Sequence, residues 1–329
     1  MNTQELVDSP LALALDFGGT KLLAGIVELA TGAVLARWQK PTPVQRGAEA
    51  SIEVMLECAM AALANSQSAL NRLRGIGISF GGPVQDDRKA VVKSMHVLGW
   101  ENLPLPDRIS SAVGLPAIMD NDANAAALGE ARFGAGRCAR NLVYVQVSTG
   151  IGSGVVIGGR LYRGQGQAGE LGHITIVPGG PMCACGRQGC LESIASGWAI
   201  ARQGREELAR ACPSSPLRIL CADSKDRLDA RLVVQASREG DVRAQRIVLQ
   251  ALEALASAIG IVICALDPEV VVVGGGLGKG MEVFADDVRA AVDRHLPATL
   301  THRTRVEFSR FGDNAALVGA ACLLEEDTS

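Results

Sequence analysis

Short apolar runs alternate with glycine-rich turns along the chain. Residues 11–15 form an apolar run that stops at Asp16, and residues 22–27 form the next run. Two strands joined by a tight turn fit this pattern, because glycine tolerates the backbone angles that such turns need. The same reasoning predicts a loop region at residues 85–106 and further strands at residues 75–79, 116–119, 142–147, 155–157 and 270–273. It predicts helices at residues 49–63, 120–133, 244–264 and 314–324.

The opening design occurs a second time in the middle of the chain. An apolar run at residues 142–147 is followed by Ser-Thr-Gly-Ile-Gly-Ser-Gly at residues 148–154 and then by another short apolar run. Two copies at this separation suggest two related half-molecules rather than a solenoid, whose period is far shorter. Strands that alternate with helices over 329 residues predict an α/β protein of two domains.

Composition narrows the possible partners. The hydrophobic fraction of 48% excludes a disordered chain, and the formal net charge of -3 carries no basic footprint for nucleic acid or an anionic membrane. The first ten residues show no secretory pattern. The longest apolar run, between Glu253 and Asp267, is shorter than the roughly 20 residues of a spanning helix. We therefore expect a cytoplasmic protein.

The two glycine turns are candidate phosphate sites. Glycine at successive positions lets backbone N–H groups line up against phosphate oxygens. Asp16 lies at the end of the first strand, where a carboxylate can hold hydrated Mg²⁺, and Thr20 and Thr149 can donate hydroxyl groups to phosphates. Each turn alone is also compatible with an ordinary hairpin. Two such turns and the strand–glycine run at residues 270–276 together favour a nucleotide site.

Two other nucleotide motifs are excluded. No G-x-x-x-x-G-K-[ST] segment occurs, so the chain has no P-loop motif. A G-x-G-x-x-G match at Gly164, Gly166 and Gly169 leads into Glu170-Leu171-Gly172-His173 rather than into a helix. This match therefore lacks the context of a dinucleotide-binding turn.

A cluster of sulfur and nitrogen ligands lies in the middle of the chain. His173 is followed by Cys183, Cys185 and Cys190, which together make the four ligands of a closed tetrahedral zinc site. The alternatives are unpaired cytosolic thiols beside an unrelated histidine, or a redox pair. The Cys-x-Cys spacing is not the Cys-x-x-Cys of redox proteins, and three thiols so close together favour a metal.

Several carboxylates are candidates for chemistry. Asp120-Asn121-Asp122 opens a predicted helix, where such residues also serve as N-caps. Glu170 precedes His173 by three residues, and Glu192 follows the last thiol by two. A cluster of Asn, Asp, Glu and His offers the donors and acceptors that a polyol substrate needs, although each acid alone is also compatible with a solvated surface position.

Seven segments across almost the whole chain carry a family resemblance. They are residues 16–21, 81–84, 120–126, 148–154, 169–173 and 183–192 and the glycine run from Gly274. In these segments the chain resembles the ROK family, whose kinases belong to the actin-like ATPase superfamily and include glucokinases and N-acetylmannosamine kinases. The resemblance implies a ribonuclease H-like fold with a duplicated βββαβαβα core. It implies an N-terminal domain at residues 1–120, a zinc-containing domain at residues 121–313, and a final helix at about 314–329 that packs back on the first domain.

The resemblance also implies roles for individual residues. Asp122 would be the catalytic base that takes the proton from a sugar hydroxyl during transfer from ATP. Structural Zn²⁺ would be held by His173, Cys183, Cys185 and Cys190. The sugar would contact Gly82, Asn121, Asp122, Glu170, His173 and Glu192. ATP and Mg²⁺ would contact Asp16, Gly18, Gly19, Thr20, Lys21, Thr149, Gly150, Gly275 and Gly276.

Two features depart from the family pattern. Ser148 and Ser153 replace glycines of the second turn, and both are small enough to leave binding intact. His96 stands where many glucokinases of the family have Asn, so we expect it to tune which sugar is used.

Three functions are considered for these residues, and we expect the first. The first is an ATP-dependent kinase for glucose, mannose, fructose or an N-acetylhexosamine, expected to be a homodimer. The second is a sugar-sensing regulator without a DNA-binding domain, and the third is a chaperone-like ATPase.

Because the phosphate turns share no ligand with the metal, we expect metal removal to weaken sugar binding more than ATP binding.

Overall fold

The computed structural model describes residues 9–65, 67–94, 97–221 and 228–326. The chain divides into two compact units. The first takes Met1–Arg140, Gly154–Ala168 and Asp313–Ser329, and the second takes Asn141–Ser153 and Gly169–Gly312. This division differs from the predicted boundary at residue 120, because the helix that follows residue 121 stays with the first unit.

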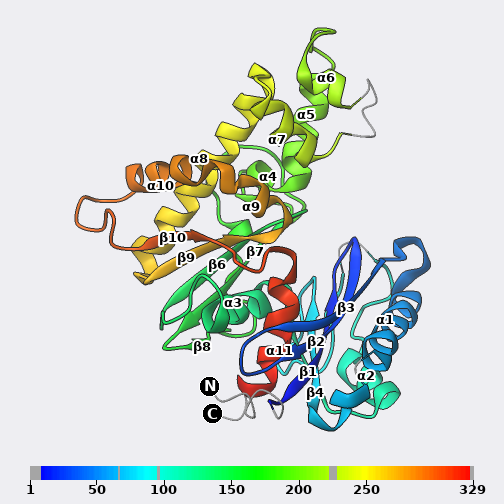
Figure 1. The fold of residues 1–329 in the computed structure, drawn as a ribbon. Helices are drawn as coiled ribbons and strands as arrows, with labels where there is room; N and C mark the ends of the chain where they lie inside the picture. Colours follow the sequence, from blue (N-terminus) through cyan, green and yellow to red (C-terminus); the bar gives the residue numbers. More distant parts are fainter. Residues whose placement is uncertain (1–8, 66, 95–96, 222–227, 327–329) are drawn as a thin grey trace. The chain divides into compact units, whose positions relative to one another are not determined.

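The sheet of the first unit has the strand order β3-β2-β1-β4-β5. Its central strand β1 pairs antiparallel with β2 and parallel with β4. In Figure 1 the helices α1 and α11 of this unit lie on opposite sides of the sheet. The elements are β1 (Leu11–Phe17), β2 (Lys21–Glu28), β3 (Val34–Pro41), α1 (Gly47–Ala64), β4 (Leu73–Phe80), α2 (Leu105–Val113), β5 (Ala117–Asn121), α3 (Asp122–Phe133), β8 (Arg160–Leu161) and α11 (Ala315–Glu326).

Strand β1 is buried on both faces, and its two faces carry different side chains. Leu13 and Leu15 belong to the core that includes Met55 of α1, whereas Ala12 and Ala14 pack in the core formed with α11. Side chains of a strand point alternately to opposite faces, so one strand supplies both cores. The small alanines leave room for α11 to approach the sheet closely.

Glycines let α11 pack at short range. A Cβ on Gly77 of β4 would lie 1.8 Å from Ala320 O of α11, and a Cβ on Gly319 would lie 1.6 Å from Ala125 O of α3. Any larger residue at either position forces the packed elements apart. Helix α11 therefore ties the end of the chain to β1, β4 and α3 of the first unit.

The second sheet repeats the order of the first. Its strands run β10-β9-β6-β7-β8, which is the same arrangement as β5-β4-β1-β2-β3. Strand β9 lies parallel to both β6 and β10. The duplicated βββαβαβα core that the resemblance implied is confirmed. The strands are β6 (Leu142–Val147), β7 (Ile151–Ile157), β9 (Val270–Gly274) and β10 (Arg305–Phe308), and the helices are α4 (Glu192–Ala195), α5 (Gly197–Leu208), α6 (Pro216–Leu220), α7 (Ala230–Arg238), α8 (Val242–Leu266), α9 (Gly275–Met281) and α10 (Ala285–Arg294).

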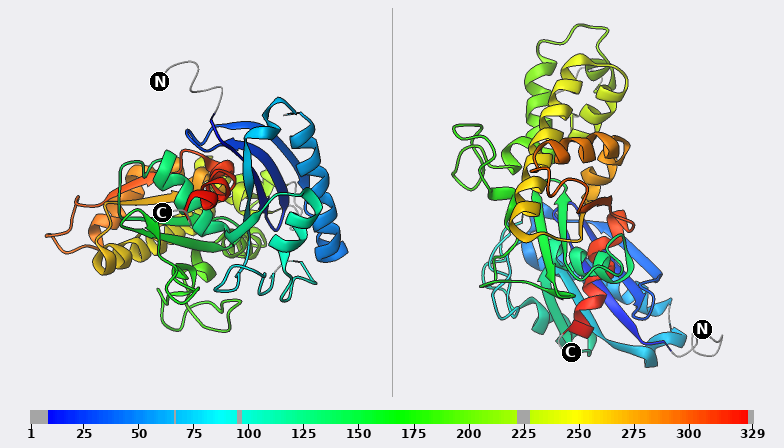
Figure 2. Two further views of the ribbon diagram at one scale, coloured as in Figure 1. Left: turned by 90° about the horizontal axis from the view of Figure 1, so that it is seen from below. Right: turned by 90° about the vertical axis from the view of Figure 1, so that its left-hand side faces the viewer.

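Helix α8 is longer than the apolar run in the sequence indicated. Its 25 residues are long and apolar enough to cross a membrane by length and composition, so our expectation that the run is too short was wrong. However, 67% of its most apolar window is buried, against neighbours that include α7 and α10. Figures 1 and 2 show α8 beside these helices, in the position of a core helix of the second unit.

Candidate active site

The first glycine turn connects β1 to β2 just beyond a buried acid. Asp16 is the next-to-last residue of β1 and is only 7% exposed. Gly18 N donates to Lys21 O at 3.1 Å, and a Cβ on Gly18 would lie 2.9 Å from the same oxygen. Gly19 is half-buried and Thr20 is exposed. The turn therefore presents backbone amides and a hydroxyl group beyond a buried carboxyl group.

Charges around Asp16 set its protonation. Its pKa is raised to about 7, chiefly by burial, and a hydrogen bond from Ser79 Oγ at 2.8 Å acts in the opposite direction. The nearby Asp122 carboxylate raises the pKa further. Lys21 lowers it, but Lys21 also forms a 2.7 Å ion pair with Asp313. Two neighbouring carboxyl groups raise each other's pKa, because the charge on one disfavours ionisation of the other. A bound cation offsets this repulsion, so the pair is suited to hold one.

Asn121 forms the N-cap of α3. Its Oδ1 accepts from Ala123 N at 2.9 Å and from Asn124 N at 3.4 Å. Its Nδ2 donates to Gly82 O at 3.0 Å, which connects the helix start to the segment after β4. The capping alternative thus holds for Asn121, and one N–H of its amide remains for a ligand.

Asp122 is the first residue of α3. Its Oδ1 accepts from Ala123 N at 2.9 Å, which fixes the carboxylate at the helix N-terminus. Its Oδ2 lies 3.8 Å from the place that a Cβ on Gly81 would occupy. The side chain is half-buried and close enough to Asp16 to raise the pKa of that group. The first unit therefore brings two predicted site acids together.

Asp120 lies in a strand rather than in the helix. We predicted that the helix begins at Asp120, but this residue pairs with Ser79 as part of β5, and the helix begins two residues later. Asp120 is 1% exposed, and its Oδ1 accepts from Asn121 N at 2.8 Å and Asn124 Nδ2 at 2.9 Å. The register of the parallel sheet places this acid beneath the start of α3.

A buried ion network holds Asp120. Arg163 Nε donates to Asp120 Oδ2 at 2.7 Å, and Arg163 Nη2 donates to Glu326 Oε2. Glu326 Oε1 accepts from Leu161 N at 3.0 Å. Arg163 thereby connects β5, the loop after β8 and the end of α11. Sequence reasoning did not identify Arg163, because its partners are far away along the chain.

The second glycine turn is shorter than predicted. Strand β7 already begins at Ile151, so the turn consists of residues 148–150 rather than 148–154. Ser148 N donates to Gly150 O at 2.9 Å, and Thr149 is exposed. Ser153 lies in the strand, where its Oγ donates to Gly169 O.

Helix α5 and Glu192 contact this second turn. Gly197 N donates to Ser148 O at 2.8 Å, and Trp198 N donates to Thr149 O at 3.1 Å. Glu192 Oε2 accepts from Ile151 N at 2.9 Å. The predicted sugar-binding carboxylate of Glu192 therefore contacts the backbone that follows the phosphate turn.

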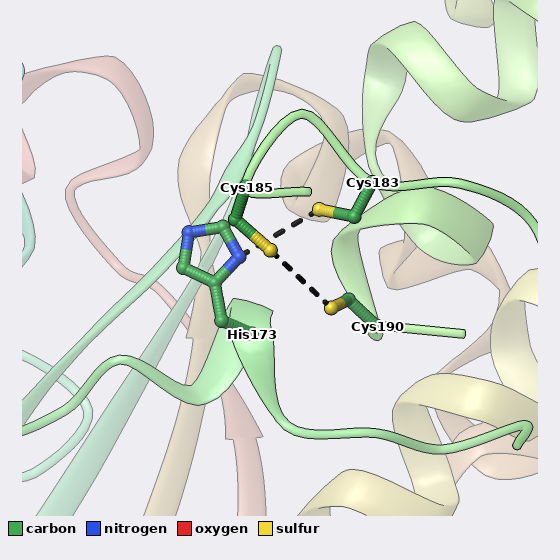
Figure 3. Close-up of side chains that lie close together, drawn as sticks. All are labelled: His173, Cys183, Cys185 and Cys190. Carbon is green, nitrogen blue, oxygen red and sulfur yellow. Dashed lines mark hydrogen bonds between the residues drawn. The ribbon is translucent and has the colours of Figure 1, made fainter. Parts of the chain in front are cut away.

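The sulfur and nitrogen ligands converge in space. Figure 3 shows His173 with its Nδ1 directed at the thiols of Cys183, Cys185 and Cys190. Their ligand atoms all lie within 4.8 Å of one another. Cys183 Sγ lies 3.7 Å from His173 Nδ1, and Cys185 Sγ lies 3.7 Å from Cys190 Sγ.

The two distances of 3.7 Å fit a tetrahedral metal. Zn–S bonds of about 2.3 Å and Zn–N bonds of about 2.0–2.1 Å place ligand atoms about 3.6–3.8 Å apart in a tetrahedron. Both measured contacts agree with this value. Burial raises the pKa of Cys183 to about 12, a cost that a bound cation removes by stabilising the thiolate.

The other ring nitrogen of His173 points away from the thiols. Its Nε2 lies 3.9 Å from Glu170 Oε2, and Glu170 itself is exposed. A metal on Nδ1 fixes the proton on Nε2, which then can donate to a ligand. Glu170 and His173 are thus adjacent, as predicted. His96 lies outside the described residues.

A cavity of about 620 Å³ lies between α7 and α9 of the second unit. Gly276 lines it, and neighbouring Gly275 has a φ of 84°, with Val147 O only 2.5 Å from the place of a Cβ. Sequence reasoning placed these glycines near a nucleotide but missed the charged residues of the cavity. The lining residues are Arg231, Val234, Gln235, Arg238, Glu239, Gly276, Leu277 and Gly280.

The family model that matches this chain is the ROK family, over residues 12–327. The chain belongs to the ROK family. A glucokinase from Thermotoga maritima is 33% identical over 95% of this chain and 97% of its own length. An N-acetylmannosamine kinase from Salmonella heidelberg is 32% identical over 96% of this chain and 99% of its own length.

A solved ROK structure has the same fold. The glucokinase from Streptomyces griseus, in complex with glucose and AMPPNP, matches with a TM-score of 0.84 at 34% identity. The match covers 95% of this chain and 98% of that one. This ROK chain therefore has the actin-like ATPase fold, with its acids in the first unit and its metal ligands in the second.

Proposed function

We propose that this ROK protein is a kinase that transfers the γ-phosphoryl group of ATP to a hydroxyl of a hexose or N-acetylhexosamine. The observation that carries the proposal is the half-buried Asp122 carboxylate at the start of α3, next to the buried Asp16. Family membership and the glucokinase and N-acetylmannosamine kinase relatives support it.

Asp122 is the proposed general base. Phosphoryl transfer needs an oriented nucleophile and neutralised charge, and a carboxylate supplies the orientation by accepting the hydroxyl proton. The bond from Ala123 N holds Oδ1, and Oδ2 lies 3.8 Å from the place that a Cβ on Gly81 would occupy. Mg²⁺, when bound with ATP, would supply positive charge that balances the negative charge of the Asp16 and Asp122 carboxylates.

The remaining residues supply binding. The two turns present backbone amides to phosphates, with Gly18, Gly19, Thr20 and Lys21 from the first and Thr149 and Gly150 from the second. Adenosine is proposed for the cavity that Gly276 lines, beside Gly275. The sugar is proposed to contact Glu170, His173 and Glu192, together with Gly82 and the unused amide N–H of Asn121.

Zn²⁺ is the proposed structural metal, held by His173, Cys183, Cys185 and Cys190, whose distances fit it. A cytoplasmic homodimer without a nucleic-acid partner remains our expectation from the sequence. The regulator and chaperone-like alternatives do not require a base at Asp122.

The test is a measurement of ADP release with MgATP and one sugar at a time. Glucose, mannose, fructose, N-acetylglucosamine and N-acetylmannosamine form the panel. We expect at least one sugar to stimulate ADP release well above the rate without sugar. Sugar binding without any stimulated ADP release would favour the regulator, and sugar-independent ADP release would favour the chaperone-like ATPase.

A further inference from the structure

The segment that connects the metal ligands to α5 runs along the second phosphate turn. Cys190 is the last thiol, Glu192 begins α4 two residues later, and Trp198 lies in the first turn of α5. This segment and the turn both belong to the second unit. A side chain of this segment can therefore act on the turn directly, through its backbone amides.

Glu192 contacts the turn at its exit. Its Oε2 accepts from Ile151 N at 2.9 Å, and a Cβ on Gly150 would lie only 2.6 Å from the same oxygen. The carboxylate therefore occupies the space beside Gly150 and fixes the amide of the next residue. A hydrogen bond to an ionised acceptor is about twice as strong as a neutral one.

One metal-binding segment packs on β7, and the other pairs with the first. Gly172, next to the ligand His173, approaches so closely that a Cβ would lie 2.2 Å from Ile151 O. On the other side, Leu191 N donates to Ile174 O at 3.0 Å, and Cys190 pairs with Thr175. The two arms of the metal cluster thus pair with each other, and the first of them lies against Ile151, the first residue of β7.

The start of α5 completes the support. Ser196 caps this helix, and the next two residues donate their amides to the carbonyls of Ser148 and Thr149. A Cβ on Gly197 would lie 2.6 Å from Ser148 O, so the fit is close. Carbonyls held in this way leave the amides of the turn in a fixed orientation for phosphate oxygens.

We infer that Glu192 is a positioning residue for the second phosphate turn, and that it links the metal-binding loop to nucleotide binding. The inference rests on the proposed function, which gives the turn its phosphate. It differs from our expectation that metal removal weakens sugar binding more than ATP binding. That expectation considered only whether the metal and the phosphate turns share a ligand, and not the contacts between the metal-binding loop and the second turn. One oxygen of Glu192 holds Ile151 N, which leaves the other for a sugar hydroxyl.

The experiment measures AMPPNP binding without sugar, by calorimetry, on purified metal-containing protein. Glu192→Ala is expected to weaken AMPPNP binding about tenfold, from the loss of one charged hydrogen bond, and Glu192→Gln is expected to weaken it less. Hydrogen exchange of the Ile151 amide is expected to accelerate in Glu192→Ala. Metal content, measured on the same samples, should equal that of the wild type.

Glu170→Ala is the matched control, since Glu170 lies near His173 but has no described bond to the turn. It should leave AMPPNP affinity unchanged. Equal AMPPNP affinity in Glu192→Ala and wild type overturns the inference while leaving the kinase proposal intact. Tighter AMPPNP binding in Glu192→Gln also overturns it, because charge repulsion would then be the role of Glu192. A wild-type protein that binds no AMPPNP overturns both proposals.

Discussion

The two glycine turns share a topology but differ in electrostatic design. In the first, the next-to-last residue of the leading strand is Asp16, which is buried and close to Asp122. In the second, the next-to-last residue of the leading strand is Gln146, and the carboxylate at the turn comes from Glu192 outside the sheet. Duplication of the fold supplies the strand–turn–strand backbone twice. The pair of carboxylates that could hold a cation lies only beside the first turn.

The helix starts differ in the same way. Strand β5 leads into α3 through Asn121 and Asp122, whereas β9 leads into α9 through Gly275 and Gly276. Only the first of these two helices begins with an acid. The second begins with a residue at positive φ, where Val147 O leaves no room for a side chain. One helix start thus offers a carboxylate, whereas the other offers backbone without a side chain.

The largest effect should come from removing the proposed base. Asp122→Asn keeps the shape of the side chain and its contact with Ala123 N, but it cannot take a proton. We expect kcat to fall about 10²–10⁴-fold with the sugar dissociation constant nearly unchanged. Steady-state kinetics and sugar titration check this. A variant with near wild-type kcat would show that Asp122 is not the base. It would also contradict the functional difference that we draw between the two helix starts.

The protonation of Asp16 should make stability depend on pH. Its folded pKa of about 7 lies above the ordinary value of 3.8, so the folded protein retains a proton that the unfolded chain releases in this window. The free energy of unfolding should therefore fall as pH rises from about 4 to 7, by at most about 4 kcal/mol. Denaturant unfolding without Mg²⁺ or nucleotide measures it.

Asp16→Asn is the control for that experiment. The variant has no carboxyl group to titrate, so the difference in stability between variant and wild type should grow toward pH 8. The same difference at pH 4 and pH 8 would show that the pKa of Asp16 is ordinary. In the second turn, Gln146 stands in the position that corresponds to Asp16, and an amide does not titrate.

Breaking the ion network beneath α3 should destabilise the first unit. Arg163→Met leaves Asp120 buried without its cation, and we expect a loss of about 3 kcal/mol in unfolding free energy. Glu326→Gln removes the other partner of Arg163 and should cost less. Adding Asp120→Asn to Arg163→Met should recover part of the loss. Full additivity of those two substitutions would contradict coupling between Arg163 and Asp120.

The smallest effect should come from the hydroxyl group of the second turn. Thr149→Val removes one exposed hydroxyl and keeps the branched shape. We expect the KM for ATP to rise about two- to tenfold, the value of one neutral hydrogen bond, with little change in kcat. An effect as large as that of Asp122→Asn would contradict the view that this turn contributes geometry rather than charge.

Local patterns in the sequence pointed to most of the candidate site. The candidate metal ligands were recognised because three thiols lie close together along the chain, and both glycine turns were recognised because their flanking strands are apolar. Repetition of the strand–turn–strand design correctly predicted the duplicated core. Amphipathic helices such as α7, which Asp229 caps, carry a recognisable period and N-cap that we did not use.

Long-range contacts could not be predicted in this way. The partners of Arg163 lie 43 and 163 residues away, and Ser79 reaches Asp16 across 63 residues. The end of β5 was misassigned to the helix, because Asp and Asn suit a cap, while pairing with β4 decides the strand. The contact of Glu192 with Ile151 likewise depends on how the metal loop folds.

The central claim is that the phosphoryl group goes to a sugar, and the most direct measurement follows that group. The protein is incubated with Mg²⁺, ATP labelled in its γ-phosphate and the best sugar of the panel, and the products are separated. The account predicts one labelled sugar phosphate for each ADP formed, with almost none from Asp122→Asn. Label that appears only as inorganic phosphate, at the same rate with and without sugar, would contradict it.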